Sequence, residues 1–107
     1  MSKPIPKQVR IRSKAHLARI RTLPCCIAGC RDERIEAHHI RRGAGVGLKS
    51  DDSLTVGLCF SHHREGHHIG WLTFESLYAV NLLEIAIRNA DVSRALGILP
   101  PEEGNNP

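Results

Sequence analysis

Residues 23–40 are LPCCIAGCRDERIEAHHI and residues 54–68 are LTVGLCFSHHREGHH. These two stretches decide the fold, because they hold all four cysteines and six of the seven histidines of the chain. Cysteine and histidine side chains concentrated in so short a segment are typical of metal sites. No apolar stretch follows the basic N-terminus, so we expect no secretory signal. The cysteines are therefore better explained as metal ligands than as disulfides.

The composition of the 107 residues indicates one small globular domain. Hydrophobic residues make up 41% and charged residues 24%, which disfavours a disordered chain, while aromatic residues make up only 4%. So few aromatic side chains give a small core, which a bound metal would stabilise. No apolar run approaches the roughly 20 residues that span a bilayer. We therefore expect a soluble protein without membrane contact, in the cytoplasm.

Charge is distributed unevenly along the chain. Residues 1–50 carry 12 Lys and Arg against three acidic residues, whereas residues 51–107 carry three Lys and Arg against eight acidic residues. A basic half is the electrostatic pattern expected of a protein that binds a polyanion such as DNA. The alternative is a solvated basic arm that only aids solubility.

Local signals predict an α+β order of elements. Ser13 can cap a helix over 14–22, which Pro24 ends. Partial alternation and β-branched residues predict two strands, over 35–40 and 54–58. A short helix is then expected to begin near Ser61 and to carry His63.

Further helices are expected in the C-terminal part of the chain. Thr73 and Asn81 are both plausible N-caps, and the pattern after Asn81 resembles a capping box. A helix is therefore predicted from Leu82 to about Ala90. The apolar positions expected to pack over the strands are Leu77, Val80, Leu83, Ile87 and Leu96.

The ends of the chain and one internal segment are predicted to be irregular. Residues 1–12 hold two prolines and scattered basic groups, which favours an extended arm. Residues 41–52 hold three glycines, which favours a loop, and residues 100–107 are predicted to be disordered. We expect the folded domain to cover residues 13–99.

The cysteines predict one metal site. The spacings Cys25-x4-Cys30 and Cys59-x2-His62 both lie within the range of paired zinc ligands, and together they supply four. Cys26 with Cys30 is an alternative first pair, less favoured because turn-borne pairs more often use spacings of two or four. The competing explanation is that these cysteines are small buried hydrophobic residues.

The remaining histidines predict a second site. His63 and His67 are four positions apart, which places both on one face of a helix. His38 would complete a three-histidine site with open positions, and His39 would then be free to act as a base. Neighbouring strand residues point to opposite faces, so both reach one site only if the strand ends or twists there. We expect no catalytic or metal-binding role for four other side chains. His16 and His68 are expected on the surface, and Trp71 and Phe74 are expected in the core.

This ordered set of motifs resembles the HNH, or ββα-metal, endonuclease family. The matching parts, over roughly residues 15–90, are Leu23–Cys30, Glu36–Ile40, Asp52, Leu58–His63 and His67. The chain looks most like the small phage and prophage nucleases of the recombination-enhancement type, which implies that it acts in a bacterial host cell. The resemblance implies an α+β fold, with a small ββα-metal core and a structural zinc knuckle. An N-terminal helix and C-terminal helices would flank that core.

The resemblance also implies roles for single residues. His39 matches the general base, and the catalytic metal would be bound by His38, His63 and His67. The structural zinc would be bound by Cys25, Cys30, Cys59 and His62. Structural Zn²⁺ and a second divalent metal (Mg²⁺, Mn²⁺ or Zn²⁺) are therefore the expected cofactors.

The chain departs from the family at the position that gives the family its middle letter. The family has an asparagine there, whereas this chain has Asp51 or Asp52. The Asp52 carboxylate could still pin the loop or orient a histidine. We therefore place Asp52 with His38 and His39 among the expected catalytic residues.

These features together predict a metal-dependent DNA endonuclease, of phage or prophage origin, that hydrolyses phosphodiester bonds with one divalent metal and a histidine base. Low sequence specificity is expected, because the candidate DNA-contacting residues would grip the backbone: Arg41, Arg42, Lys49 and Arg64. Besides DNA, a recombination or phage protein is a partner to test for. The alternative is a non-catalytic zinc-stabilised module that binds DNA or assists recombination, which would not need the further histidines.

Overall fold

The structure is a computed structural model that describes residues 11–41 and 51–101. Most of the expected arm, most of the glycine-containing loop and most of the expected tail lie outside these residues. Along the described chain the elements are α1 (Lys14–Arg21), β1 (Ile35–His39), β2 (Thr55–Cys59), α2 (Phe60–Ile69), α3 (Trp71–Tyr78) and α4 (Leu82–Ala95). The α+β class is confirmed: within the described residues, four helices accompany one two-stranded sheet.

The two strands form an antiparallel pair whose register runs from Ile35 opposite Cys59 to His39 opposite Thr55. An isolated pair of strands is only marginally stable in water, so this pair needs cover. Every residue of β2 is buried, because helices pack against it. Gly57 allows β1 and α1 to approach β2 closely, since a Cβ there would lie 3.0 Å from Ile35 Cγ2 and 3.2 Å from the Ile20 carbonyl oxygen.

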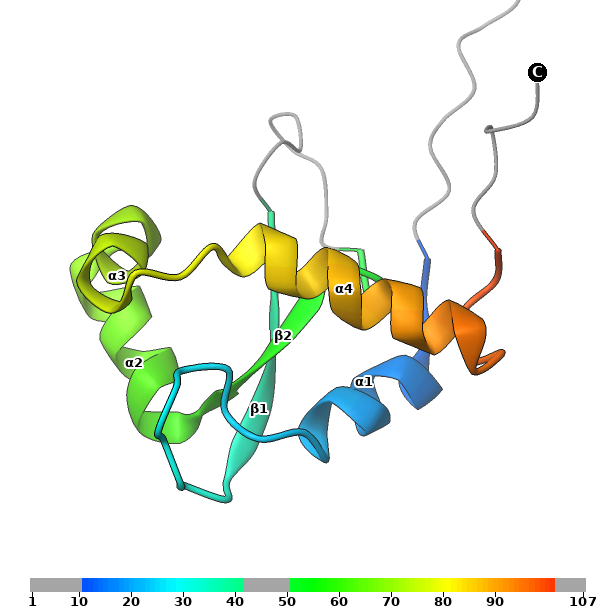
Figure 1. Ribbon diagram of the computed structural model, residues 1–107, viewed down its shortest axis with the longest axis horizontal. Coiled ribbons are helices and arrows are strands. Elements are labelled where there is room, and N and C mark those ends of the chain that lie inside the picture. The colour runs from blue at the N-terminus through cyan, green and yellow to red at the C-terminus, as the bar shows by residue number, and fades with distance from the viewer. Residues whose placement is uncertain (1–10, 42–50, 102–107) are drawn as a thin grey trace, which may run out of the picture.

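The helices cover the sheet from several directions. Figure 1 shows α4 crossing the strands, α1 beside it, and α2 with α3 gathered at the other end of the molecule. The fully buried centre consists of side chains from most of these elements: Ile20, Val56, Leu58, Phe74, Leu82 and Ala86. This arrangement brings both strands into contact with α2.

Several predicted element ends are confirmed. Ser13 caps α1, and its side chain accepts a hydrogen bond from the His16 N–H. Asn81 caps α4 in the same way, through the Glu84 N–H. Helix α4 runs to Ala95, beyond the predicted end near Ala90, and α2 begins at Phe60, one residue before Ser61.

The predicted cap at Thr73 is wrong, because Thr73 lies inside α3. That helix begins at Trp71, and Gly70 precedes it with φ of 91°. A left-handed conformation of this kind favours glycine and lets the chain turn abruptly between α2 and α3. Phe74 is fully buried, as expected.

Three of the apolar positions predicted to cover the strands are exposed instead. Leu77 is 59%, Ile87 46% and Leu96 61% exposed, whereas Val80 and Leu83 pack against the core. Helix α3 ends at Tyr78 and α4 begins at Leu82, so the two helices do not share one apolar stripe. The buried stripe of α4 consists of Leu82, Ala86, Ala90 and Ser93.

The prediction that His16 lies on the surface is also wrong. His16 is completely buried between α1, α4 and β2. Its Nδ1 lies 2.7 Å from Ser93 Oγ, and its Nε2 lies 3.2 Å from Thr55 Oγ1. Both ring nitrogens thus have polar partners, which makes burial of the imidazole tolerable.

Among the helices of the described residues, none is both long enough and apolar enough to cross a lipid bilayer.

Candidate metal centres

Four predicted ligands form one cluster at the junction of β2 and α2. The ligand atoms of this four-ligand cluster all lie within 4.8 Å of one another, and they belong to Cys25, Cys30, Cys59 and His62. The His62 Nδ1 is 3.1 Å from Cys59 Sγ and 3.5 Å from Cys25 Sγ. Cys59 also caps α2, because its sulfur accepts a hydrogen bond from the His62 N–H.

The donor set of this cluster suits a structural metal such as zinc. Three sulfurs and one imidazole nitrogen form a common tetrahedral zinc set. The sulfurs of Cys30 and Cys59 are 3.7 Å apart, and the cysteines are free thiols. In a tetrahedral site with Zn–S bonds of about 2.3 Å, sulfurs would be roughly 3.8 Å apart. Burial raises the pKa of the Cys59 thiol to about 11, so a cation beside this sulfur would be needed to form its thiolate at neutral pH.

Cys26 stands outside the four-ligand cluster. Its backbone N–H donates to the Gly57 carbonyl at 2.9 Å, which fastens the turn over residues 25–30, here called the cysteine turn, to β2. Burial raises the pKa of the Cys26 thiol to about 12. Cys25 is thus the cysteine whose sulfur faces the other ligands, and Cys26 serves the turn through its backbone.

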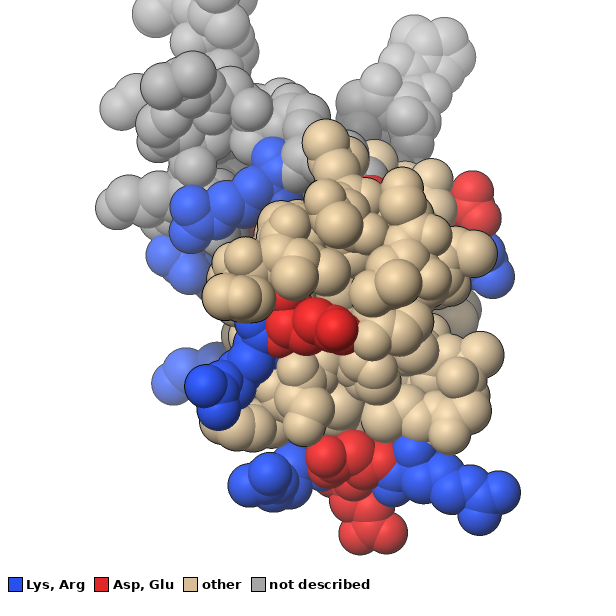
Figure 2. All heavy atoms as spheres, turned by 90° about the vertical axis from the view of Figure 1, so that its left-hand side faces the viewer, with Lys and Arg blue, Asp and Glu red and all other residues tan. Residues whose placement is uncertain are grey.

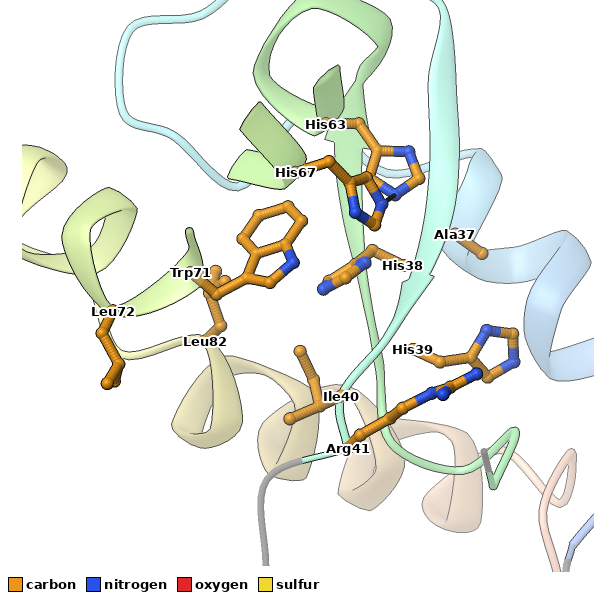
Figure 3. Close-up of a pocket in the computed structure, with 10 residues that line it drawn as sticks. All are labelled: Ala37, His38, His39, Ile40, Arg41, His63, His67, Trp71, Leu72 and Leu82. Atoms are coloured by element: carbon orange, nitrogen blue, oxygen red, sulfur yellow. Dashed lines mark hydrogen bonds between the residues drawn. The ribbon is translucent and has the colours of Figure 1, made fainter. Parts of the chain in front are cut away.

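A second cluster consists of three histidines on β1 and α2. The ligand nitrogens of His38, His63 and His67 lie within 4.8 Å of one another, and the Nε2 atoms of His63 and His67 are 3.2 Å apart. Figure 3 shows the three rings turned toward one another, with His38 reaching across from the strand. Helix α2 provides the four-residue spacing that brings His63 and His67 together.

Glu36 lies against the three-histidine cluster, although no role for it was predicted from the sequence. Its Oε1 lies 2.6 Å from His63 Nδ1. That contact leaves His63 Nε2 directed at the other two histidines. A carboxylate on the far nitrogen is the usual outer partner of a metal-binding histidine. Strand alternation could have predicted this residue, because Glu36 and His38 lie two positions apart on β1 and share a face.

Trp71 forms one wall of the three-histidine cluster. Its ring centroid is 4.1 Å from that of His38 and 5.2 Å from that of His67. Gly66 makes room for it, because a Cβ at that position would lie 1.9 Å from Trp71 Cζ3. Burial, reinforced by His63 and His67, lowers the pKa of His38 to about 4. His38 is therefore neutral at pH 7, which is the form that binds metals.

His39 is paired with Asp52 on the other side of the strand. The His39 Nε2 lies 2.8 Å from Asp52 Oδ1, and Asp52 Oδ2 accepts a hydrogen bond from the Ser13 N–H at 2.9 Å. Burial alone would raise the pKa of Asp52, but the hydrogen bonds from Ser13 and His39 hold it below the usual value. Asp52 thus pins the chain before α1 and orients His39. The neighbouring Asp51 accepts a hydrogen bond from the Ile11 N–H at 3.0 Å.

His38 and His39 line one cavity of about 860 Å³. Figure 3 shows His38 directed toward His63, His67 and Trp71, while His39 projects away from them, on the side of Arg41. The alternation of the strand is therefore retained. The two neighbouring histidines line the same cavity from different sides of β1, and the strand ends at His39, which is one of the two arrangements expected from the sequence.

Comparison with known proteins gives a family without a described activity. Residues 2–97 match the family described as "Protein of unknown function (DUF968)". The chain belongs to this family. It is 30% identical over 97 residues to "Uncharacterized protein YdfU" of Escherichia coli (strain K12). That match covers 89% of the chain but only 27% of the relative's length. No solved structure was found to match.

The predicted DNA-contacting residues of this DUF968 chain are only partly described. Arg41 is exposed and lines the cavity beside His39. Arg64 is exposed on α2, next to His63. Arg42 and Lys49 lie outside the described residues. His68, expected on the surface, is exposed there.

Proposed function

We propose that this chain is a metal-dependent DNA endonuclease of the HNH, ββα-metal type. One observation carries the proposal: the three-histidine cluster and the Asp52-held His39 line the same cavity. Three imidazoles fill only part of a metal's coordination shell, which is typical of catalytic rather than structural sites. A zinc-stabilised binding module would have no use for this second arrangement.

The divalent cation would be held by His38, His63 and His67. The donor chemistry of these residues fits such a cation, because the neutral His38 and the His63 oriented by Glu36 present nitrogen lone pairs to a common point. When bound, a divalent cation there would supply Lewis-acid stabilisation of the negative charge that develops on the phosphate and on the leaving oxygen. Mg²⁺, Mn²⁺ and Zn²⁺ are the candidates to test.

His39 is the proposed general base. With its Nε2 proton directed at Asp52 Oδ1, the neutral ring keeps a lone pair on Nδ1. Nδ1 takes a proton from water, the water oxygen attacks phosphorus, and the bond to the 3′-oxygen breaks. The departing 3′-oxygen takes a proton from solvent. The Asp52 carboxylate stabilises the imidazolium that forms and fixes the ring orientation.

The four-ligand cluster is the proposed structural zinc site. It would tie the turn that holds Cys25 and Cys30 to the start of α2. His62 and His63 are neighbours on α2, yet one belongs to each cluster. A rigid zinc site beside the three-histidine cluster would therefore fix the direction from which His63 and His67 approach the second metal.

DNA is the proposed substrate, gripped through its backbone by Arg41 and Arg64, and by Arg42 and Lys49. Contacts of this kind predict low sequence specificity and a strong dependence of binding on salt. A phage or prophage origin and a recombination or phage protein partner belong to the same proposal, and they rest on the resemblance alone. A cytoplasmic location also belongs to it, and it rests on the interpretation of the cysteines as metal ligands rather than disulfides.

The test is cleavage of supercoiled plasmid by zinc-loaded wild-type protein and by His39→Ala, with Mg²⁺, Mn²⁺ or Zn²⁺ added. We expect metal-dependent nicking by wild type and a loss of at least about a hundredfold in His39→Ala, the usual effect of removing a general base. DNA binding and zinc content should be retained in the variant. DNA binding without nicking by wild type under any metal would favour the non-catalytic binding module instead.

A further inference from the structure

Two arginines share one exposed aromatic ring beside the metal centres. The guanidinium carbons of Arg34 and Arg64 each lie 5.2 Å from the centroid of the Phe60 ring. Phe60 itself is 37% exposed, which is unusual for a side chain of this size. We call these three residues the arginine clamp.

The clamp brings together two cations that would otherwise repel each other. In the described part of the chain, no carboxylate lies within ion-pair distance of either guanidinium. By contrast, Arg88 is paired with Glu84, and Arg94 with Asp91. The attraction of each guanidinium to the ring face is what holds the pair together. Two guanidinium groups held by one ring, with no carboxylate partner among the described residues, can offer their N–H donors to an anion.

Stacking on a ring leaves the arginine donors free. A guanidinium that lies over an aromatic face uses its own face, so the N–H groups around its edge remain available. Those N–H groups match the oxygens of a phosphate in a two-pronged arrangement. Because Phe60 orders both side chains beforehand, less conformational entropy is lost when an anion binds.

The position of the clamp associates it with the proposed active site. Arg64 follows His63 on α2, and Arg34 lies two residues before Glu36, the partner of His63. The Phe60 N–H donates to the Arg34 carbonyl at 3.1 Å, which joins the two segments. Figure 2 looks onto the α2–α3 end of the molecule, where acidic side chains lie near the centre of the face and at its lower edge, with Lys and Arg side chains beside them. A phosphate that approaches this face would therefore depend on local contacts with single arginines.

We propose that the arginine clamp binds a backbone phosphate of the DNA strand, next to the phosphate held at the three-histidine cluster. The choice of ligand rests on the proposed function, since a polynucleotide offers a second phosphate beside the one that is cleaved. The clamp would set the direction of the strand across the cavity. It would not discriminate between bases, because phosphates carry no sequence information.

The test is the salt dependence of DNA binding by full-length, zinc-loaded protein in a His39→Ala background, which removes cleavage. Anisotropy of a fluorescein-labelled duplex gives the dissociation constant over a series of NaCl concentrations. The variants are Arg34→Gln, Arg64→Gln, both together, and Phe60→Leu. Arg88→Gln is the control, because that arginine is exposed on α4 and paired with Glu84.

Each clamp arginine should account for one phosphate contact. The slope of log affinity against log salt should fall by about one in each single variant and by about two in the double variant. Phe60→Leu keeps both charges but removes the ring, and it should weaken binding where a purely electrostatic patch would not. Arg88→Gln should leave the slope unchanged.

Slopes that match the Arg88→Gln control in both Arg34→Gln and Arg64→Gln would overturn the clamp, and so would a background protein that does not bind the duplex. If Phe60→Leu loses its zinc, the two exposed arginine variants still decide the question. Reduced slopes together with no nicking by wild-type protein would uphold the clamp and refute the nuclease, so the two failures are distinguishable.

Discussion

At the scale of single residues, the candidate site is built from histidines, and a carboxylate partner on one ring nitrogen determines the role left to the other. Glu36 contacts His63 Nδ1, which directs His63 Nε2 at the other two histidines, and Asp52 contacts His39 Nε2. The histidines and their spacing could be predicted from the sequence, because strand and helix periods place them. The pairing of Glu36 with His63 could not be fixed, because it depends on how α2 lies against β1, across 27 residues of chain.

Glu36→Gln should weaken metal binding at the three-histidine cluster by roughly 10- to 100-fold, because the charged outer partner that orients His63 is lost. Trp71 reports this binding, since it is the sole tryptophan and touches the cluster. Zinc-loaded protein would be titrated with Ni²⁺, and quenching of the Trp71 fluorescence followed. Glu33→Gln, an exposed neighbour, is the matched control. Equal affinities in the two variants would show that Glu36 has no part in the site.

At the scale of elements, local signals placed the strands, α1 and the start of α4. Ser13 and Asn81 are caps that act within three residues, so they are visible in the sequence. The start of α3 was not predictable in this way, because Gly70 begins the turn and Trp71 fits over Gly66 only after α2 has formed. Leu77 was predicted to be buried but is exposed, because the face that α3 turns to the core also depends on this turn.

The cysteine turn provides a matched pair of variants at this scale. Cys25→Ser should lose the zinc and lower the melting temperature sharply, because structural zinc contributes directly to folding. Cys26→Ser should keep one zinc per chain and cost about 1 kcal/mol, as an ordinary substitution of a half-buried residue does. Metal analysis and thermal melts measure both effects. Retention of zinc by Cys25→Ser, with loss in Cys26→Ser, would reverse the ligand assignment.

At the scale of the whole molecule, a series of buried hydrogen bonds, here called the polar chain, links α1, α4 and β2. Arg19 Nε donates to Ser93 Oγ at 2.8 Å, and Thr55 Oγ1 donates to the Asp52 carbonyl at 3.4 Å. His16 joins the two hydroxyls, accepting from Ser93 and donating to Thr55, which requires a neutral ring. The partner residues are 77 and 39 positions away from His16, so no local pattern could have predicted its burial.

This polar chain predicts how stability depends on pH. Burial, with Arg19 and Arg94 nearby, lowers the pKa of His16 despite the opposing effect of Asp52 and Asp51. The unfolded chain therefore binds a proton at this residue before the folded protein does, and the free energy of unfolding falls as the pH drops below about 6.5. The loss from Asp52, whose pKa is also lowered, begins only below about pH 4.

His16→Asn removes one of two histidines whose lowered pKa acts in this window, and the other, His38, stays in both proteins. Urea unfolding followed by circular dichroism between pH 7.5 and 5 should show a shallower fall in stability for His16→Asn than for wild type. Parallel curves for the two proteins would mean that a charged His16 is accommodated in the fold.

The central claim is that the three-histidine cluster is a nuclease centre, and nicking of supercoiled plasmid tests it most directly. Wild type, His67→Ala and His68→Ala would be compared in the presence of Mg²⁺, Mn²⁺ or Zn²⁺. His67 and His68 are exposed neighbours on α2, but only His67 faces the cluster. The account predicts metal-dependent nicking by wild type and His68→Ala and its loss in His67→Ala. Equal nicking by both variants, or none by wild type with any metal, would contradict it.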